Sequence, residues 1–299
     1  MRKIVLFVAL AATSFTLFAQ PKQGAARPSF AGFFGPRQET VQVWPDGAPN
    51  AFEITDEERE RVRNNGSDYT VATLDIYPAR NPNGLCVIAC PGGGYAMLSN
   101  THEAKDFKDW YNARGITLAV LQYRLPREHH DVPLSDVKEA IRIMKGREDL
   151  GVKHVGVMGC SAGGHLASTA ATHLTGDLRP EFQILFYPVI TMDLSFTHRD
   201  SHDRLIGKDA SQELVDLYSN DKQVTAETCP AFIVAASDDF LVPVKNSLVY
   251  YQALVDNHVS ATMHLYPTGG HGFGVGDNYI YKADWSQELN DWLNVVIKK

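Results

Sequence analysis

The chain has 299 residues, of which 44% are hydrophobic and 21% charged, a balance that suits a globular protein with a sizeable core and does not require more than one domain. The formal net charge is −7, and no cluster of basic residues is present that would follow phosphates, so nucleic acid is excluded as a partner. A neutral or weakly charged substrate fits this charge better.

Residues 1–19 have the pattern of a secretory signal peptide. Arg2 and Lys3 form a short positive region, an apolar run follows, and Ala19 supplies a small residue for cleavage. The apolar run is too short and wrongly flanked for a membrane anchor. We therefore expect a secreted or periplasmic protein without a membrane anchor.

Composition divides the remaining chain into two parts. Residues 20–40 are rich in Pro, Gly, Ala and Gln and predict a flexible lead-in, whereas residues 41–299 have the patterning of one folded domain. The four cysteines lie in or beside predicted strands or at a tight turn, and no pair has zinc-ligand spacing. We interpret them as small buried hydrophobes, with a disulfide, which export would permit, as the weaker alternative, and we predict no metal site. They are Cys86, Cys90, Cys160 and Cys229.

Strands and helices are expected to alternate along the folded part. Residues 69–77 have strand composition and suggest an antiparallel edge strand, and Asn100 with Glu103 suggests a helix cap. Further strands are expected over residues 85–90, 116–121, 155–158, 184–187, 232–236 and 263–266, and helices over residues 100–112, 134–144, 244–255 and 285–297. This alternation predicts an α/β fold, with a mostly parallel central sheet and helices on both faces. Residues 191–228 break it and predict a short cap insertion with one or two short helices.

A Gly-x-Ser-x-Gly sequence, from Gly159 to Gly163, lies between a predicted strand and a helical run of small residues. This is the context of a nucleophile elbow, a sharp turn that exposes the serine hydroxyl, here that of Ser161. Glycine is needed on both sides because a side chain would crowd the turn. The unpaired N–H groups at the start of the helix suit a reaction that builds negative charge on an oxygen.

A nucleophilic serine needs a base and an orienting acid, and in open α/β sheets such groups follow the carboxyl ends of strands. Asp238 and Asp239 come directly after the strand at 232–236, and either can be the acid from its position. His271 lies among glycines after the last strand, which is a poor position for a core histidine, so it is the candidate base. The order serine, acid, histidine is that of α/β-hydrolases.

The other histidines are weaker candidates for the base. His165 lies on the helix after the elbow, where we expect its ring to be satisfied locally. His129 and His130 lie in a polar loop and at most line a rim, and His198 and His202 lie in the predicted cap.

Three consecutive glycines follow the strand at 85–90 and allow backbone N–H groups to approach a substrate oxygen. We expect the N–H groups of Gly93 and Gly94 to join that of Ala162 as oxyanion donors. Tyr95 ends this run and is expected to contact the substrate. A phosphate-binding loop is excluded because neither Gly-x-Gly-x-x-Gly nor Gly-Lys-Ser/Thr follows.

Together these motifs resemble the α/β-hydrolase superfamily, and more narrowly the secreted bacterial esterases of the acetyl xylan esterase-like and hormone-sensitive-lipase-like kind. The resemblance covers most of the chain from Val43 onward and rests on residues 43–49, 91–95, 123–126, 156–165, 217–220, 239–243 and 269–274. It implies Ser161 as nucleophile, His271 as base and Asp239 as acid, with no metal or cofactor. Lipase-like relatives have a histidine where this chain has Pro91, which favours the acetyl xylan esterase-like branch.

The resemblance implies a serine esterase that removes acyl groups, above all acetyl, from plant polysaccharide such as xylan or from its oligosaccharides. Alternatives among enzymes are a feruloyl or general short-chain carboxylesterase and a prolyl-oligopeptidase-like peptidase. The peptidase is weaker because no propeller domain precedes the hydrolase core. The alternative from another class is a catalytically silent hydrolase fold that acts as a binding protein, which the complete triad in the expected order disfavours.

Overall fold

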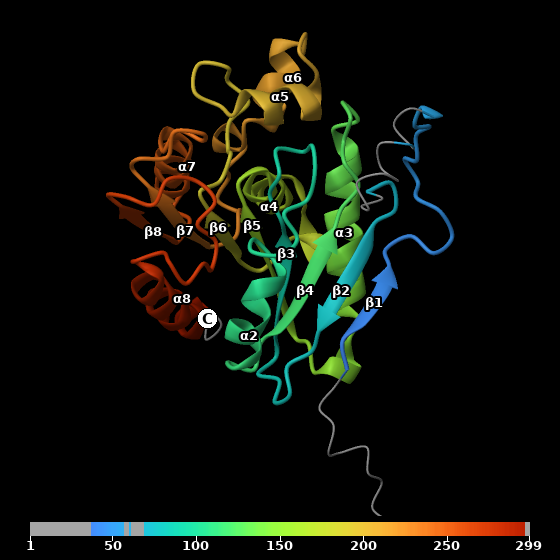
Figure 1. The fold of residues 1–299 in the computed structure, drawn as a ribbon, viewed down its shortest axis with the longest axis vertical. Coiled ribbons are helices and arrows are strands. Elements are labelled where there is room, and N and C mark those ends of the chain that lie inside the picture. The colour runs from blue at the N-terminus through green and yellow to red at the C-terminus, as the bar shows by residue number, and fades with distance from the viewer. Residues whose placement is uncertain (1–36, 57–59, 61–68, 297–299) are drawn as a thin grey trace, which may run out of the picture. The chain divides into compact units, whose positions relative to one another are not determined.

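The computed structural model describes residues 37–56, 60 and 69–296 (Figure 1). The predicted signal peptide and most of the predicted lead-in over 20–40 lie outside the described residues. The prediction of a flexible lead-in was wrong for its last residues, because Glu39 and Thr40 belong to the first strand of the sheet and pair with Ile76 and Asp75. The folded part therefore begins before residue 41.

An eight-stranded sheet in the order β1-β2-β4-β3-β5-β6-β7-β8 forms the centre of the fold. The pairs β1–β2 and β2–β4 are antiparallel, and all other neighbours in the sheet are parallel, which confirms the predicted mostly parallel sheet. The strands are β1 (Glu39–Gln42), β2 (Thr73–Tyr77), β3 (Leu85–Cys90), β4 (Thr117–Gln122), β5 (His154–Cys160), β6 (Gln183–Phe186), β7 (Ala231–Ala236) and β8 (Ala261–Tyr266).

One strand prediction was wrong in position. The strand predicted over residues 69–77 is antiparallel as expected, but β2 is not at the edge of the sheet, because β1 covers its outer side. The short β1 has side chains that are alternately half-buried and exposed, so it lacks the long apolar run by which the other strands were found. Strands β3, β6 and β7 are buried along their whole length, as expected of strands covered on both faces.

Helices cover both faces of the sheet, as predicted. Buried side chains of α3, α4 and α7 pack with one face, and those of α2 and α8 pack with the other (Figure 1). The α-helices are α2 (Lys108–Asn112), α3 (Asp131–Lys145), α4 (Ala162–His173), α5 (Arg199–Ile206), α6 (Gln212–Tyr218), α7 (Lys245–Asp256) and α8 (Lys282–Val296). None of the helices in the described part of the chain is long and apolar enough to cross a membrane.

The predicted cap is present as α5, α6 and a 3₁₀ turn, η5 (Asn220–Lys222), and it stands at the top of Figure 1. Asn220 fixes the cap to α4, since its amide nitrogen donates to the carbonyl of His165 and to the hydroxyls of Ser168 and Thr169, at 3.1, 2.8 and 2.9 Å. Asn220 thereby ties the cap to the helix that follows Ser161.

A buried ion pair holds together two segments on which the family resemblance rests. The guanidinium of Arg124 contacts the carboxylate of Asp136 at 2.6 Å, and the indole N–H of Trp44 donates to the same carboxylate at 2.7 Å. Both charged side chains are almost fully buried, so removing either one would leave an uncompensated charge in the core. The four cysteines are free and buried, which confirms their interpretation as core residues.

Candidate active site

Ser161 lies at the sharp turn between β5 and α4 with φ 54° and ψ −123°. A non-glycine residue in this region of backbone space is strained, and such strain persists only where the surroundings enforce it. The flanking glycines show how it is enforced. A side chain at Gly159 would overlap the carbonyl of Gly163, and a side chain at Gly163 would overlap the carbonyl of Cys90 at the end of β3. The elbow predicted from the sequence is present.

The structure brings Ser161, His271 and Asp239 into one hydrogen-bonded chain. His271 Nε2 lies 2.8 Å from Ser161 Oγ, and His271 Nδ1 lies 2.7 Å from Asp239 Oδ2. The other carboxylate oxygen of Asp239 accepts the backbone N–H groups of Leu241 and Val242 at 3.0 and 2.9 Å. The acid is thereby fixed, and it fixes the imidazole in turn.

The geometry also separates the two candidate acids. Asp238 is exposed and faces the loop of residues 267–274 that contains His271, hereafter the histidine loop, where Asp238 Oδ1 accepts the backbone N–H of Gly270 at 2.7 Å. It therefore holds the loop beside His271, whereas Asp239 contacts the imidazole itself. A sequence in which both carboxylates follow the same strand does not distinguish these two contacts.

The glycine loop after β3 lies next to the elbow, with Gly93 at φ 125° and Gly94 at φ 61°. These conformations strain any residue with a side chain, and a Cβ at Gly93 would also overlap the carbonyl of Met97. Ala162 is the first residue of α4, so its N–H has no acceptor within the helix. Gly93, Gly94 and Ser161 line one cleft, and Ala162 follows Ser161 directly, but the role of these N–H groups as oxyanion donors stays a prediction.

Tyr95 does not line this cleft, and its predicted contact with substrate is corrected. Its side chain is 2% exposed and points into the core, where its hydroxyl lies 2.9 Å from Nδ1 of His165. Burial lowers the pKa of His165 to about 4, and Nε2 of the same ring lies 2.8 Å from the carbonyl of Tyr218 in the cap. His165 is satisfied as expected, but by distant residues of the glycine loop and the cap.

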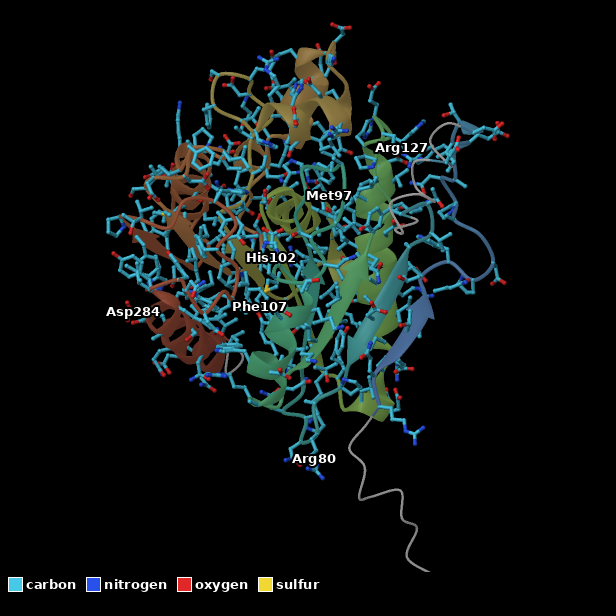
Figure 2. All side chains as sticks on the ribbon, viewed as in Figure 1. Arg80, Met97, His102, Phe107, Arg127 and Asp284 are labelled. Carbon is cyan, nitrogen blue, oxygen red and sulfur yellow. The ribbon has the colours of Figure 1, made fainter. Side chains whose placement is uncertain are left out.

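The cleft above Ser161 is open to solvent. Its walls come from the glycine loop, the start of α5 in the cap and the histidine loop. Met97 and His102, two of the lining residues, are labelled in Figure 2. The lining residues are Gly93, Gly94, Ala96, Met97, Ser99, His102, Glu103, Ser161, His198, Asp200, Arg204, Leu241, His271 and Gly272. The cap therefore supplies polar and charged side chains to one wall.

Several of these lining residues were not found by sequence reasoning. Glu103 was interpreted as part of a helix cap with Asn100, but the structure buries its carboxyl beneath the glycine loop, where it accepts the N–H of Gly92. His198 was placed in the cap without a role, and the structure puts it at the cleft beside Gly94. Burial lowers the pKa of His198, which favours the neutral ring. His129 and His130 lie outside this cleft. The ring of His129 stacks on Phe52, and Nδ1 of His130 is hydrogen-bonded to the hydroxyl of Tyr218.

The fold and the site define a class of protein. A mostly parallel sheet with helices on both faces and an elbow serine after β5 is characteristic of α/β-hydrolases, in which a histidine and a carboxylate follow later strands. A family model described as alpha/beta hydrolase fold matches residues 87–275. The chain belongs to this family.

Individual relatives are also recognisable. The chain is 39% identical over 239 residues to an acetylxylan esterase of Xylanibacter ruminicola, covering 78% of this chain and 50% of that protein. It is 32% identical over 219 residues to endo-1,4-beta-xylanase B of Butyrivibrio fibrisolvens, covering 67% of this chain and 34% of that protein. The chain thus spans half or less of these curated relatives.

Solved structures resemble the whole described fold. An acetyl ester-xyloside bifunctional hydrolase from Caldicellulosiruptor lactoaceticus has a TM-score of 0.75 and 31% identity, covering 88% of this chain and 97% of that chain. A carboxylesterase from Lactobacillus plantarum has a TM-score of 0.68, covering 87% and 97%, but at 23% identity it shows the fold alone.

Proposed function

We propose that the protein is a secreted or periplasmic serine esterase that removes acetyl groups from xylan or xylan oligosaccharides. The observation that carries the proposal is the hydrogen-bonded chain from Ser161 through His271 to Asp239 at the floor of an open cleft. Export is part of the proposal and rests on the signal-peptide pattern of residues 1–19.

The proposed reaction begins with attack of Ser161 Oγ on the ester carbonyl. Nε2 of His271 accepts the hydroxyl proton, while Nδ1–H donates to Asp239, which stabilises the imidazolium that forms. The carbonyl oxygen becomes negative in the tetrahedral intermediate, and the N–H groups of Gly93, Gly94 and Ala162 stabilise it by donating hydrogen bonds. The intermediate then collapses: the bond between its central carbon and the sugar oxygen breaks, His271 Nε2–H protonates the departing oxygen, and the acetyl group stays on Ser161 Oγ.

The second half of the reaction returns the enzyme to its starting state. A water molecule loses a proton to His271 Nε2 and attacks the acetyl group bound to Ser161 Oγ. The second tetrahedral intermediate collapses, acetate leaves, and the proton returns from the imidazolium to Ser161 Oγ. All the groups used in these steps are side chains or backbone N–H groups of the chain.

The choice of acetylated xylan is supported by the relatives. Both the acetylxylan esterase of Xylanibacter ruminicola and the bifunctional hydrolase of Caldicellulosiruptor lactoaceticus are named for activity on acetyl esters, and they are 39% and 31% identical to this chain. The open cleft, with polar residues from α5 on one wall, is compatible with a bulky alcohol such as a sugar. A general short-chain carboxylesterase is the second candidate, since carboxylesterase structures share the fold.

The test is acetate release by the purified protein from acetylated xylan, measured beside hydrolysis of p-nitrophenyl acetate and methyl ferulate. Ser161→Ala is the control for every substrate. We expect acetate from xylan, hydrolysis of the nitrophenyl ester, no ferulate release, and a variant that loses nearly all activity.

The other outcomes separate the alternatives. Hydrolysis of the nitrophenyl ester alone would contradict the xylan substrate and leave a general esterase. Ferulate release in excess of acetate would favour a feruloyl esterase. A wild-type protein with no hydrolysis of any ester, but with retained xylan binding in Ser161→Ala, would show a binding protein.

A further inference from the structure

We propose that Glu103 is a positioning residue that joins the glycine loop to the histidine loop, so that the oxyanion donors and the catalytic base hold one fixed geometry. This inference rests on the proposed esterase function, because it assigns a role within the same site. The role follows from two hydrogen bonds that leave the same carboxyl in different directions.

The first contact reaches the glycine loop. The N–H of Gly92 donates to Glu103 Oε2 at 3.0 Å, directly before the two glycines proposed as oxyanion donors. There is no spare room at this point, because a Cβ on Gly92 would lie 2.5 Å from Glu103 Oε2 and 2.9 Å from Cβ of Ser161. Glu103 therefore fixes the approach of the loop to the nucleophile.

The second contact reaches the histidine loop through Tyr187. The hydroxyl of Tyr187 donates to Glu103 Oε1 at 3.1 Å and accepts the backbone N–H of Gly274 at 3.0 Å. The Tyr187 ring also packs edge-on against the imidazole of His271, with ring centroids 4.9 Å apart. One carboxyl is thus connected to both loops that must meet at the substrate carbonyl.

The surroundings of Glu103 distinguish it from an ordinary surface acid. The residue is 4% exposed although it lines the catalytic cleft, so its carboxyl depends on these internal partners. Burial raises the pKa of Glu103, and the nearby His102 and the Tyr187 hydrogen bond oppose that effect. Burying a carboxyl costs desolvation free energy even when its hydrogen-bond partners are present. Its position beside Ser161 therefore favours a role in the site over a role in the core alone.

Steady-state kinetics with p-nitrophenyl acetate test this role in three variants: Glu103→Ala, Glu103→Gln and Tyr187→Phe. Removal of the bridge in Glu103→Ala should lower kcat by about 10- to 100-fold with little change in KM, because displaced reacting groups lose transition-state stabilisation. Glu103→Gln should restore most of that loss, since its amide oxygen accepts the Gly92 N–H and its amide nitrogen donates to Tyr187. Glu103→Ala and Tyr187→Phe should not be additive when combined, since each breaks the same bridge.

The matched control is Gln183→Ala. Gln183 is 0% exposed, its side-chain oxygen accepts the hydroxyl of Tyr250 at 3.0 Å, and it lies at the amino end of β6, away from the site. This variant loses that bond and a second one, from the Gln183 amide nitrogen to the carbonyl of Cys229 at 3.1 Å, so it should lower the melting temperature and leave kcat unchanged. The inference would be overturned if Glu103→Ala had the same kcat as Gln183→Ala, or if its only change were in KM. Either result would leave the esterase activity of the wild-type protein unaffected.

If the wild-type protein hydrolysed no ester, labelling of Ser161 by a fluorophosphonate would replace kcat as the measured rate. Slower labelling in Glu103→Ala than in Gln183→Ala would still support the bridge, and equal rates would refute it.

Discussion

The elbow and the histidine loop bring two groups of the same site together by different physical means. The elbow holds Ser161 by steric exclusion, because neither Gly159 nor Gly163 has room for a Cβ. The histidine loop is packed at its ends, where a Cβ on Gly269 would lie 2.7 Å from the Tyr279 ring and one on Gly274 2.5 Å from the carbonyl of His102. On either side of His271, however, Gly270 and Gly272 have open space, and hydrogen bonds from distant residues hold the loop there. The position of Ser161 is thus determined by packing against backbone on both sides, whereas the chain immediately around His271 is held mainly by polar contacts.

This difference predicts how each region responds to change. Closely packed backbone atoms cannot move apart without strain, so even one added methyl group should disrupt the elbow. A loop held by hydrogen bonds should become less well positioned by a small amount each time one of those bonds is removed.

The largest effect is expected for Gly163→Ala. The new methyl group would overlap the carbonyl of Cys90 and lie 2.5 Å from that of Pro91, both of which are backbone atoms that cannot rotate away. We expect a large drop in thermal stability together with nearly complete loss of esterase activity. A variant with wild-type melting temperature and kcat would show that the elbow is not held by exclusion.

Asp239→Asn should lower kcat by about 10⁴-fold, because an amide in place of the carboxylate disfavours the required imidazole tautomer. Asp238→Asn is the matched control at the neighbouring position, since its amide oxygen still accepts the N–H of Gly270. Kinetics of the two variants should therefore differ by orders of magnitude. Equal losses would contradict the assignment of Asp239 as the acid.

Acid should weaken the fold through His165. Its pKa is about 4 in the folded protein and about 6.5 in an unfolded chain, because burial disfavours the charged ring. As the pH falls below 6.5, the unfolded state gains a proton that the folded state does not, so stability is lost between pH 6.5 and 4, by up to about 3 kcal/mol.

Urea unfolding at several pH values measures this effect, with His165→Gln as the comparison. The variant should be less stable at neutral pH and should show a shallower loss of unfolding free energy on acidification. An unchanged slope would show that other groups cause the acid sensitivity.

The smallest effect is expected for Gly270→Ala. This residue has φ 59° and nothing within 4 Å of an added Cβ, so only the backbone conformation resists the change, at a cost of about 1 kcal/mol. A melting scan should show a drop of a few degrees, and kcat should stay close to wild type. A loss as large as that of Gly163→Ala would remove the contrast between the two regions.

The same contrast explains what the sequence predicted. Steric exclusion is encoded locally, so the glycines around Ser161 and the small residues of α4 identified the elbow from a short segment. Buried apolar runs likewise identified the inner strands, whereas the four residues of β1 have no such run.

Long-range polar contacts have no local signature. The bond between Tyr95 and His165 joins residues 70 positions apart, and the bond between Glu103 and Tyr187 joins residues 84 positions apart. Neither pair shows a spacing from which its contact follows, so Tyr95 was expected at the substrate and Glu103 at a helix cap. The roles of Asp238 and Asp239 were distinguished only by the resemblance and then by their partners.

The most direct test of the central claim is covalent labelling of the wild-type protein with a fluorophosphonate, followed by peptide mapping. This reagent phosphonylates a serine that a neighbouring base activates. The account predicts a single label on Ser161, and loss of that label in His271→Ala with the fold retained. A label on another residue, or labelling of Ser161 at an unchanged rate in His271→Ala, would contradict the claim that His271 activates this serine.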